Sequence, residues 1–152
     1  MGRLKGIPDI LSPDLLHVLA SMGHGDEIVL ADANYPSAST ARARGARELR
    51  ADFHSVSALL DAILQFFPLD TYVDKPVAVM RPTASDRQKG VTVDIWDRYK
   101  DVMRSRTGRS WGFDELERFD FYERAKGAYA VVQTGETALY SNVILKKGAI
   151  AD

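Results

Sequence analysis

The chain has 152 residues, 45% of them hydrophobic and 27% charged, which are ordinary values for one globular domain. It contains no cysteine, so disulfide frameworks, thiolate nucleophiles and cysteine-ligated zinc sites are excluded. A formal net charge of -1 gives no indication of a polyanion-binding protein. Residues 1–8 lack the apolar core of a secretory signal, and no apolar run reaches the ~18 residues of a membrane helix. We therefore expect one domain over residues 1–152, located in the cytoplasm and without a membrane partner.

The first predicted helix has clear signals at both ends. Ser12 can cap its N-terminus, Pro13 suits the first helical position, and Asp14 complements the positive end of the helix dipole. Apolar residues then recur at helical spacing as far as Met22, and Gly23 offers a left-handed stop.

The middle of the chain contains two buried strands and a second helix. Residues 27–32 and residues 76–80 are short apolar runs that predict buried strands. Residues 55–67 place their apolar side chains on one face, which predicts an amphipathic helix. The arginine-rich stretch 40–50 fits no clear pattern, apart from a short strand over residues 47–51.

The C-terminal half continues this alternation of helices and strands. Residues 83–90 are polar and indicate a loop, and residues 91–106 predict a helix. Residues 113–126 are expected to be helical over at least their second half, and residues 129–134 and 139–145 are strands that could form a hairpin. Helices that alternate with buried strands predict an α/β fold with a mostly parallel sheet and one antiparallel edge.

Among the three histidines, His24 is the strongest candidate for chemistry. It lies between Gly23 and Gly25 at a helix-to-strand junction, where small neighbours leave an imidazole accessible. An imidazole can give and take protons near neutral pH. The alternative is an ordinary solvent-facing loop histidine. No two histidines have ligand spacing, so we expect no metal site.

Two further positions favour the binding of a polar, uncharged ligand. Asp32 ends a predicted strand, at the sheet edge where α/β proteins usually bind ligands, although a carboxylate there can also simply cap the next turn. Arg118 and Tyr122 are four residues apart and share a helix face, where their donors suit a polar neutral ligand. A surface arginine stacked on a tyrosine is the alternative for that pair.

Tyr140 and Asn142 form a weaker candidate pair. They are two residues apart in a predicted strand, so both side chains point to one face. An asparagine offers both a donor and an acceptor, as a polyhydroxylated ligand requires.

The arginine-rich stretch 40–50 has one further interpretation. Four arginines and one glutamate give it a local charge of +3, so an RNA-contacting arm is conceivable. It lacks interleaved aromatic residues and a basic domain behind it, which favours a solvated or intersubunit face. We expect no nucleic-acid partner.

The phosphate-binding P-loop and the Gly-x-Ser-x-Gly nucleophile elbow are also missing.

Several segments together resemble the RbsD/FucU family of sugar mutarotases. The segments are Met-Gly-His-Gly-Asp-Glu-Ile at 22–28, Ala-Asp-Ala-Asn-Tyr-Pro at 31–36, Phe-Tyr-Glu-Arg-Ala at 121–125, Thr-Gly-Glu at 134–136 and Tyr-Ser-Asn-Val-Ile-Leu-Lys-Lys-Gly at 140–148. The resemblance is close over residues 4–36 and 118–148. It is looser between them, and stretches 40–50 and 83–113 depart from the family pattern, which leaves the sugar and the ring size open.

The resemblance implies a fold, an activity and a set of site residues. The fold would be a single-domain RbsD-like sandwich with helices on both faces of the sheet. The family histidine that donates a proton falls on His24, with Tyr122 as a second proton-transfer candidate and Asp32 as a sugar contact or a partner of the imidazole. The remaining sugar contacts fall on Arg118, Tyr140, Ser141 and Asn142. Family members form homo-oligomeric rings, commonly decamers, with the sugar site near a subunit contact.

The expected function is therefore the interconversion of the anomers of a free monosaccharide without a cofactor. The sequence at 121–125 resembles the L-fucose mutarotase branch, because the D-ribose pyranase branch has lysine in place of Tyr122 and histidine in place of Arg118. D-ribose pyranase, a mutarotase for a related sugar, and a sugar-binding protein without turnover are the alternatives.

Overall fold

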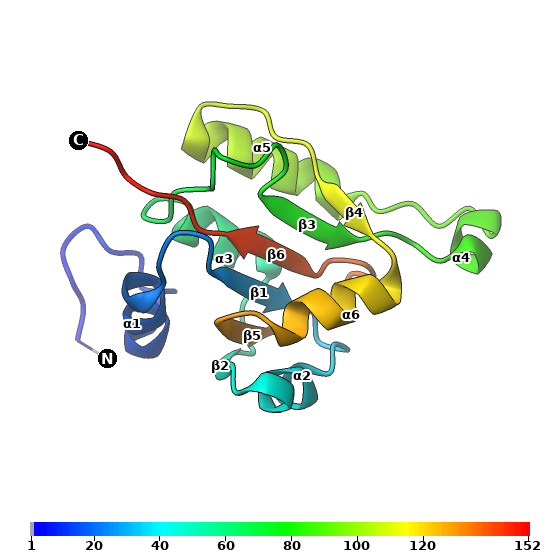
Figure 1. The fold of residues 1–152 in the computed structure, drawn as a ribbon, viewed down its shortest axis with the longest axis horizontal. Helices are drawn as coiled ribbons and strands as arrows, with labels where there is room; N and C mark the ends of the chain where they lie inside the picture. The colour runs from blue at the N-terminus through cyan, green and yellow to red at the C-terminus, as the bar shows by residue number, and fades with distance from the viewer. Residues whose placement is uncertain (1) are drawn as a thin grey trace.

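The computed structural model describes residues 2–152, in which one sheet of six strands lies between two layers of helices (Figure 1). The strands are β1 (Glu27–Ala31), β2 (Arg47–Ala51), β3 (Val77–Met80), β4 (Asp114–Leu116), β5 (Ala130–Thr134) and β6 (Val143–Lys146). The helices are α1 (Pro13–Ser21), α2 (Ser37–Arg44), α3 (Val56–Ile63), α4 (Ala84–Gln88), α5 (Ile95–Thr107) and α6 (Arg118–Lys126).

The sheet is mostly parallel, as predicted. Its strand order is β2-β5-β1-β6-β3-β4, and β6 alone among these strands runs antiparallel to its neighbours, β1 and β3. The predicted α/β class is confirmed. The antiparallel strand, however, lies inside the sheet and not at its edge, because β6 is buried on both faces and pairs along both sides.

Alternation along β1 shows why helices cover both faces of the sheet. Ile28 and Leu30 pack into the larger core with α1, α3 and α5, whereas Val29 and Ala31 pack into the smaller core with α2 and α6. Successive strand residues point to opposite faces, so a strand with apolar residues at every position needs cover on both sides. The predicted helical layers on both faces are confirmed.

The predicted hairpin between the last two strands is wrong. β5 pairs with β1 and β2, and β1 lies between it and β6. Residues 139–142, which were expected to open the last strand, instead form the connection that crosses to the other side of β1. A short apolar run carries no information about which strand it pairs with. The closeness of the two strands in sequence therefore did not predict their pairing.

Three polar elements also differ from the sequence predictions. The arginine-rich stretch contains α2, which ends at Gly45 with φ 77° before the correctly predicted β2. Residues 84–88, expected as loop, form α4, which buries no residue and so leaves no apolar pattern. Residues 114–116 form the short strand β4 ahead of α6. No helix within residues 2–152 is both long and apolar enough to cross a bilayer.

The topology brings distant segments together at two opposite edges of the sheet. The carboxyl ends of β1 and β3 meet the amino end of the antiparallel β6 at one edge, on the side where α4 projects at the right of Figure 1. The loop before β1 and the residues after β6 meet at the other edge, on the side of both chain ends in Figure 1. The candidate residues divide between these two edges.

Candidate functional site

A polar pocket of about 370 Å³ opens at the first of these edges. This volume falls within the ~300–1,000 Å³ typical of small-molecule sites. Five residues predicted from the sequence line it, and we call it the carboxyl-edge pocket: Asp32, Arg118, Tyr122, Tyr140 and Asn142. The structure thus brings together residues from the ends of β1 and β6 and from the first turns of α6.

Asp32 is the buried carboxylate of this pocket, with 6% of its surface exposed. Its backbone N–H donates to Asn142 Oδ1 at 2.7 Å, and its Oδ1 accepts the backbone N–H of Asn34 at 3.0 Å. Burial raises the pKa of Asp32, and hydrogen bonds from the Asn34 backbone and the Asn142 side chain offset part of that rise. Asp32 is therefore a fixed acceptor for a ligand hydroxyl. Its carboxyl group also holds a proton to a higher pH than that of an ordinary aspartate.

Arg118 and Tyr122 share a face of α6, as their spacing predicts. Arg118 Nε donates to the Tyr122 hydroxyl at 3.2 Å, and the guanidinium also lies 5.4 Å from the centre of the Tyr122 ring. The hydrogen bond to Tyr122 raises the pKa of the already basic Arg118. Tyr122 packs edge-on against Tyr35, with ring centres 5.5 Å apart, and this contact holds it at the pocket wall.

In the segment from Tyr140 to Asn142, two residues line the pocket and one has a structural role. Tyr140 and Asn142 line the carboxyl-edge pocket, but Ser141 does not. The Ser141 side chain is fully buried, and its hydroxyl donates to the Ala138 carbonyl at 2.6 Å. Its own carbonyl accepts the hydroxyl of Tyr99 at 2.7 Å. Ser141 therefore shapes the connection, and its side chain is not placed to contact a ligand.

His24 lies at the opposite edge of the sheet. Its Nε2 is 3.0 Å from Asp70 Oδ1, and its ring centre is 5.2 Å from that of Tyr72. The Asp70 side chain is only 5% exposed, whereas that of His24 is 43% exposed. A buried carboxylate thus holds an accessible imidazole, and we call these two residues the His24–Asp70 pair.

Burial and hydrogen bonding act in opposite directions on Asp70. Burial alone would raise the pKa of Asp70, but the Tyr72 backbone N–H, the His24 ring and the nearby Lys146 charge bring it below its ordinary value. Asp70 is therefore an ionised carboxylate at neutral pH, suited to orient an imidazole and to stabilise its protonated form.

The backbone around His24 is held by short local bonds. Gly25 has φ 89°, a left-handed conformation that favours glycine, and its N–H donates to the Lys147 carbonyl at 2.8 Å. Asp26 accepts the Gly23 N–H at 2.7 Å, and Lys147 Nζ donates to two carbonyls at the end of α1. The two glycines flanking His24 therefore serve a defined turn.

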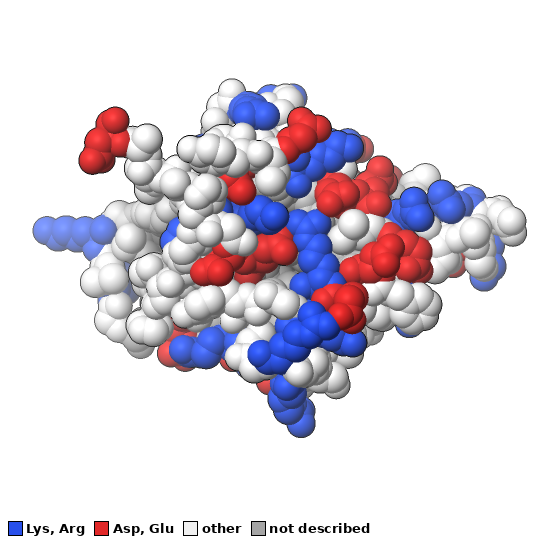
Figure 2. All heavy atoms as spheres, viewed as in Figure 1, with Lys and Arg blue, Asp and Glu red and all other residues white. Residues whose placement is uncertain are grey.

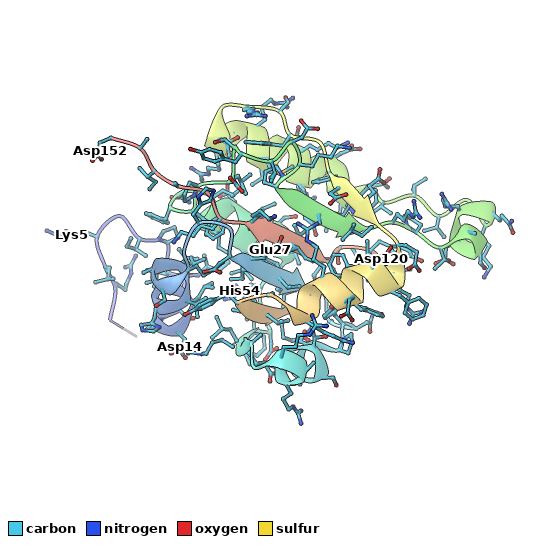
Figure 3. All side chains as sticks on the ribbon, viewed as in Figure 1. Lys5, Asp14, Glu27, His54, Asp120 and Asp152 are labelled. Carbon is cyan, nitrogen blue, oxygen red and sulfur yellow. The ribbon has the colours of Figure 1, made fainter. Side chains whose placement is uncertain are left out.

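The structure does not bring His24 and Asp32 together within one chain. Strand β1 separates them, and the path from its first residue to Asp32 is about 16 Å at ~3.3 Å per residue. In Figure 3, the labelled Glu27, which is the first residue of β1, lies away from the labelled Asp120 of α6. The proposed acid/base group and the proposed sugar contacts are two separate half-sites.

The hollow beside His24 differs from the carboxyl-edge pocket in chemistry. It has a volume of about 500 Å³ and is lined chiefly by apolar side chains of α1, of residues 66–68 and of residues 148–150. Apart from His24, its lining offers few groups that could hold the hydroxyls of a sugar. Polar recognition therefore belongs to the carboxyl-edge pocket.

Among the residues of the two half-sites that sequence reasoning missed, Asp70, Thr83 and Asp86 form hydrogen bonds to predicted site residues or to their partners. Asp70 follows the second amphipathic helix without any motif, and only its distance to His24 identifies it. Thr83 and Asp86 line the carboxyl-edge pocket from a segment expected to be a plain loop. A Thr-x-x-Asp spacing at a helix start was the available signal, because it resembles a capping box.

The structure also locates the side chains that could serve as metal ligands and those of the arginine-rich stretch. Among residues 2–152, no three histidine, aspartate or glutamate side chains are grouped as metal ligands. In the arginine-rich stretch, Arg44 pairs with Glu123 and Arg50 pairs with Asp52. Figure 2 shows acidic and basic side chains intermixed on the face in view. These pairings favour a solvated face over an RNA-binding arm.

Comparison with known proteins gives one family over nearly the whole chain. The model of the RbsD / FucU transport protein family matches residues 5–150. The fucose mutarotase of Homo sapiens is 52% identical over 151 residues, which is 99% of this chain and 97% of that protein. The L-fucose mutarotase of Haemophilus influenzae strain 86-028NP is 48% identical over 145 residues, 95% of this chain and 96% of that protein.

Solved structures agree with this match. The crystal structure of the fucose mutarotase from Streptococcus pneumoniae in complex with L-fucose superposes with a TM-score of 0.88. The two sequences are 48% identical, and the match covers 97% of this chain and 100% of the other. RbsD of Bacillus subtilis complexed with D-ribose shares the fold, with a TM-score of 0.69 at 21% identity.

Proposed function

Because the chain belongs to the RbsD / FucU transport protein family, we propose that it is an L-fucose mutarotase, an isomerase that interconverts the α and β anomers of the free sugar. The observation that carries this conclusion is the near-complete match to fucose mutarotases at about half identity, one of them with L-fucose bound. The carboxyl-edge pocket supports it, since its carboxylate, guanidinium, amide and phenols suit a neutral polyhydroxylated ligand.

The reaction needs two coordinated proton transfers. The ring oxygen of the hemiacetal gains a proton while the anomeric hydroxyl loses one, which opens the ring to the aldehyde. Rotation about the C1–C2 bond and closure with the opposite transfers give the other anomer. The proton count is unchanged over the cycle and no electron is transferred, so acid/base groups alone suffice. One positioned group of this kind contributes roughly 10²–10⁴-fold.

His24 is the proposed acid and base, and Asp70 orients it. The Asp70 contact fixes one ring nitrogen at 3.0 Å and leaves the other nitrogen for the sugar. Asp32, Arg118, Tyr140 and Asn142 would hold the hydroxyls, and Tyr122 is the second candidate for a proton transfer. Ser141 would act through the shape of the 140–142 segment.

Because these groups occupy two edges of one chain, the active site would form between two copies. The His24–Asp70 pair of one copy would close the carboxyl-edge pocket of its neighbour. Large apolar side chains are exposed beside both half-sites: Tyr72 is 83% exposed near His24, and Phe119 and Leu139 are 68% and 60% exposed near the pocket. An interface between copies would cover these side chains and remove their apolar surface from water. A ring-shaped homo-oligomer, a decamer by family resemblance, in the cytoplasm completes the proposal.

The direct test is anomer exchange of L-fucose measured by saturation-transfer NMR. The wild-type protein should accelerate exchange of L-fucose more than exchange of D-ribose, and His24→Ala should abolish the acceleration. Binding of L-fucose without faster exchange would instead identify a sugar-binding protein. Preferential exchange of D-ribose would identify a pyranase.

A further inference from the structure

Tyr140 has an unusual backbone that its neighbours hold in place. Its φ of 57° is left-handed, a conformation that a residue with a bulky side chain rarely adopts. Two side chains of α5 fix the backbone directly after it: Trp96 Nε1 donates to the Tyr140 carbonyl at 2.9 Å, and the Tyr99 hydroxyl donates to the Ser141 carbonyl at 2.7 Å. This backbone directs the Tyr140 side chain to the wall of the carboxyl-edge pocket.

The Tyr140 hydroxyl has two partners, both from the start of α4. It accepts the backbone N–H of Thr83 at 3.2 Å and donates its proton to Asp86 Oδ2. The Thr83 hydroxyl in turn accepts the Asp86 backbone N–H at 3.2 Å, which is the N-cap of α4. A single capped turn therefore supplies both partners of a phenol 54 residues further along the chain.

These two bonds decide what Tyr140 can offer to a ligand. A phenol has one proton to donate, and here Asp86 accepts it. One lone pair of the oxygen accepts the Thr83 N–H, so the capacity that remains for a ligand is a single acceptor position. A hydrogen bond to a carboxylate also makes the phenol oxygen a better acceptor, because hydrogen bonds in a chain polarise one another.

Asp86 has a role that a solvated helix residue would not have. It forms no ion pair in the part of the chain that the structure describes, although Arg118 lines the same pocket. Its bond to Tyr140 also connects α4, which projects from the body of the protein in Figure 1, to the pocket.

We propose that Asp86 is a positioning residue that holds the Tyr140 hydroxyl as an acceptor for a donating hydroxyl of the sugar. The proposal rests on the proposed mutarotase function. Asp86 acts through Tyr140, so its contribution must disappear when the Tyr140 hydroxyl is absent.

A double-mutant cycle tests this dependence, with Asp86→Ala, Tyr140→Phe and the double variant compared with wild type. The dissociation constant of L-fucose is measured by calorimetric titration, and anomer exchange by saturation-transfer NMR. Asp86→Ala should weaken L-fucose binding about tenfold in the wild-type background and less than about twofold in the Tyr140→Phe background. Asp86→Asn, which keeps an acceptor oxygen, should restore most of the binding.

The control is Ser85→Ala, because Ser85 is exposed on the same short helix, and it should bind L-fucose like wild type. Equal losses from Asp86→Ala in both backgrounds, or no loss in either, would overturn the proposal. A wild-type protein that binds L-fucose without accelerating exchange would refute the mutarotase function alone, since the binding cycle would still test the positioning role.

Discussion

Replacing Asp70 tests whether His24 works as an oriented acid and base. The oxygen of Asp70 that lies 3.0 Å from His24 Nε2 also accepts the backbone N–H of Tyr72 at 3.0 Å. The carboxylate is buried and fixed from two sides, whereas the imidazole is accessible. In Asp70→Ala, the imidazole of His24 can still donate and accept a proton, but it loses the hydrogen-bond partner that sets its orientation.

The size of the effect follows from the lost hydrogen bond. A hydrogen bond to a charged group contributes roughly 1.5–3 kcal/mol, and ~1.4 kcal/mol corresponds to a factor of ten in rate. Asp70→Ala should therefore lower kcat by about 10- to 150-fold. His24→Ala removes the acid and base themselves and should cost roughly 10²–10⁴-fold, the larger loss of the two. The double variant should be no slower than His24→Ala, because Asp70 acts through His24.

The assay is saturation-transfer NMR of L-fucose over a range of sugar concentrations, which separates kcat from KM. KM should change little, since Asp70 does not line the carboxyl-edge pocket. Asp74→Ala, an exposed carboxylate in the same loop, is the matched control and should behave like wild type. A folded Asp70→Ala protein with wild-type kcat would refute the reasoning, as would a loss confined to KM.

Three further predictions concern the pocket and the fold. Because the pKa of Asp32 is raised in the folded protein, ionisation of this carboxyl group destabilises the folded state. The stability that protonated Asp32 contributes is therefore lost as pH rises from the ordinary pKa of an aspartate through the raised pKa. Asp32→Asn should thus raise Tm at pH 7 while weakening L-fucose binding, and a lower Tm in thermal melts would contradict this. Tyr122→Phe, assayed by NMR exchange, should lose about 5- to 150-fold in kcat/KM if its hydroxyl meets the sugar; an unchanged value would exclude that contact. In Gly135→Ala, the new Cβ would lie 1.9 Å from the Asp52 carbonyl oxygen, so denaturant unfolding should show a loss of about 3 kcal/mol or more, and wild-type stability would be the contrary result.

Apolar periodicity predicted the elements that build the core. The runs that became β1 and β3 are buried throughout, and α3 carries its apolar residues on one face, so each bears a strong local signal. The polar helices α2 and α4 bear no such signal, since α2 buries only Ser37, Thr40 and Ala41 and α4 buries no residue. The pairing of the last two strands was also predicted wrongly, because β5 and β6 are adjacent in sequence and yet lie on opposite sides of β1.

The same limit explains which part of the candidate site could be predicted. Five residues expected at strand ends and on one helix face line one pocket, because sheet topology collects such positions at one edge. The partners Asp70 and Asp86 lie 46 and 54 residues from His24 and Tyr140, and no local spacing reports contacts over such separations. The separation of His24 from Asp32 also follows from the direction of β1, since the two residues flank opposite ends of one strand.

The central claim is that the two half-sites meet only between copies, and complementation tests it most directly. His24→Ala and Asp32→Asn chains are produced together with different affinity tags, and assemblies that contain both are isolated. If each site takes its histidine from one copy and its pocket from another, random mixing leaves both halves intact in about a quarter of the sites. The mixed protein should then show about a quarter of the wild-type rate of L-fucose anomer exchange. A rate no higher than that of either variant alone would contradict the shared site.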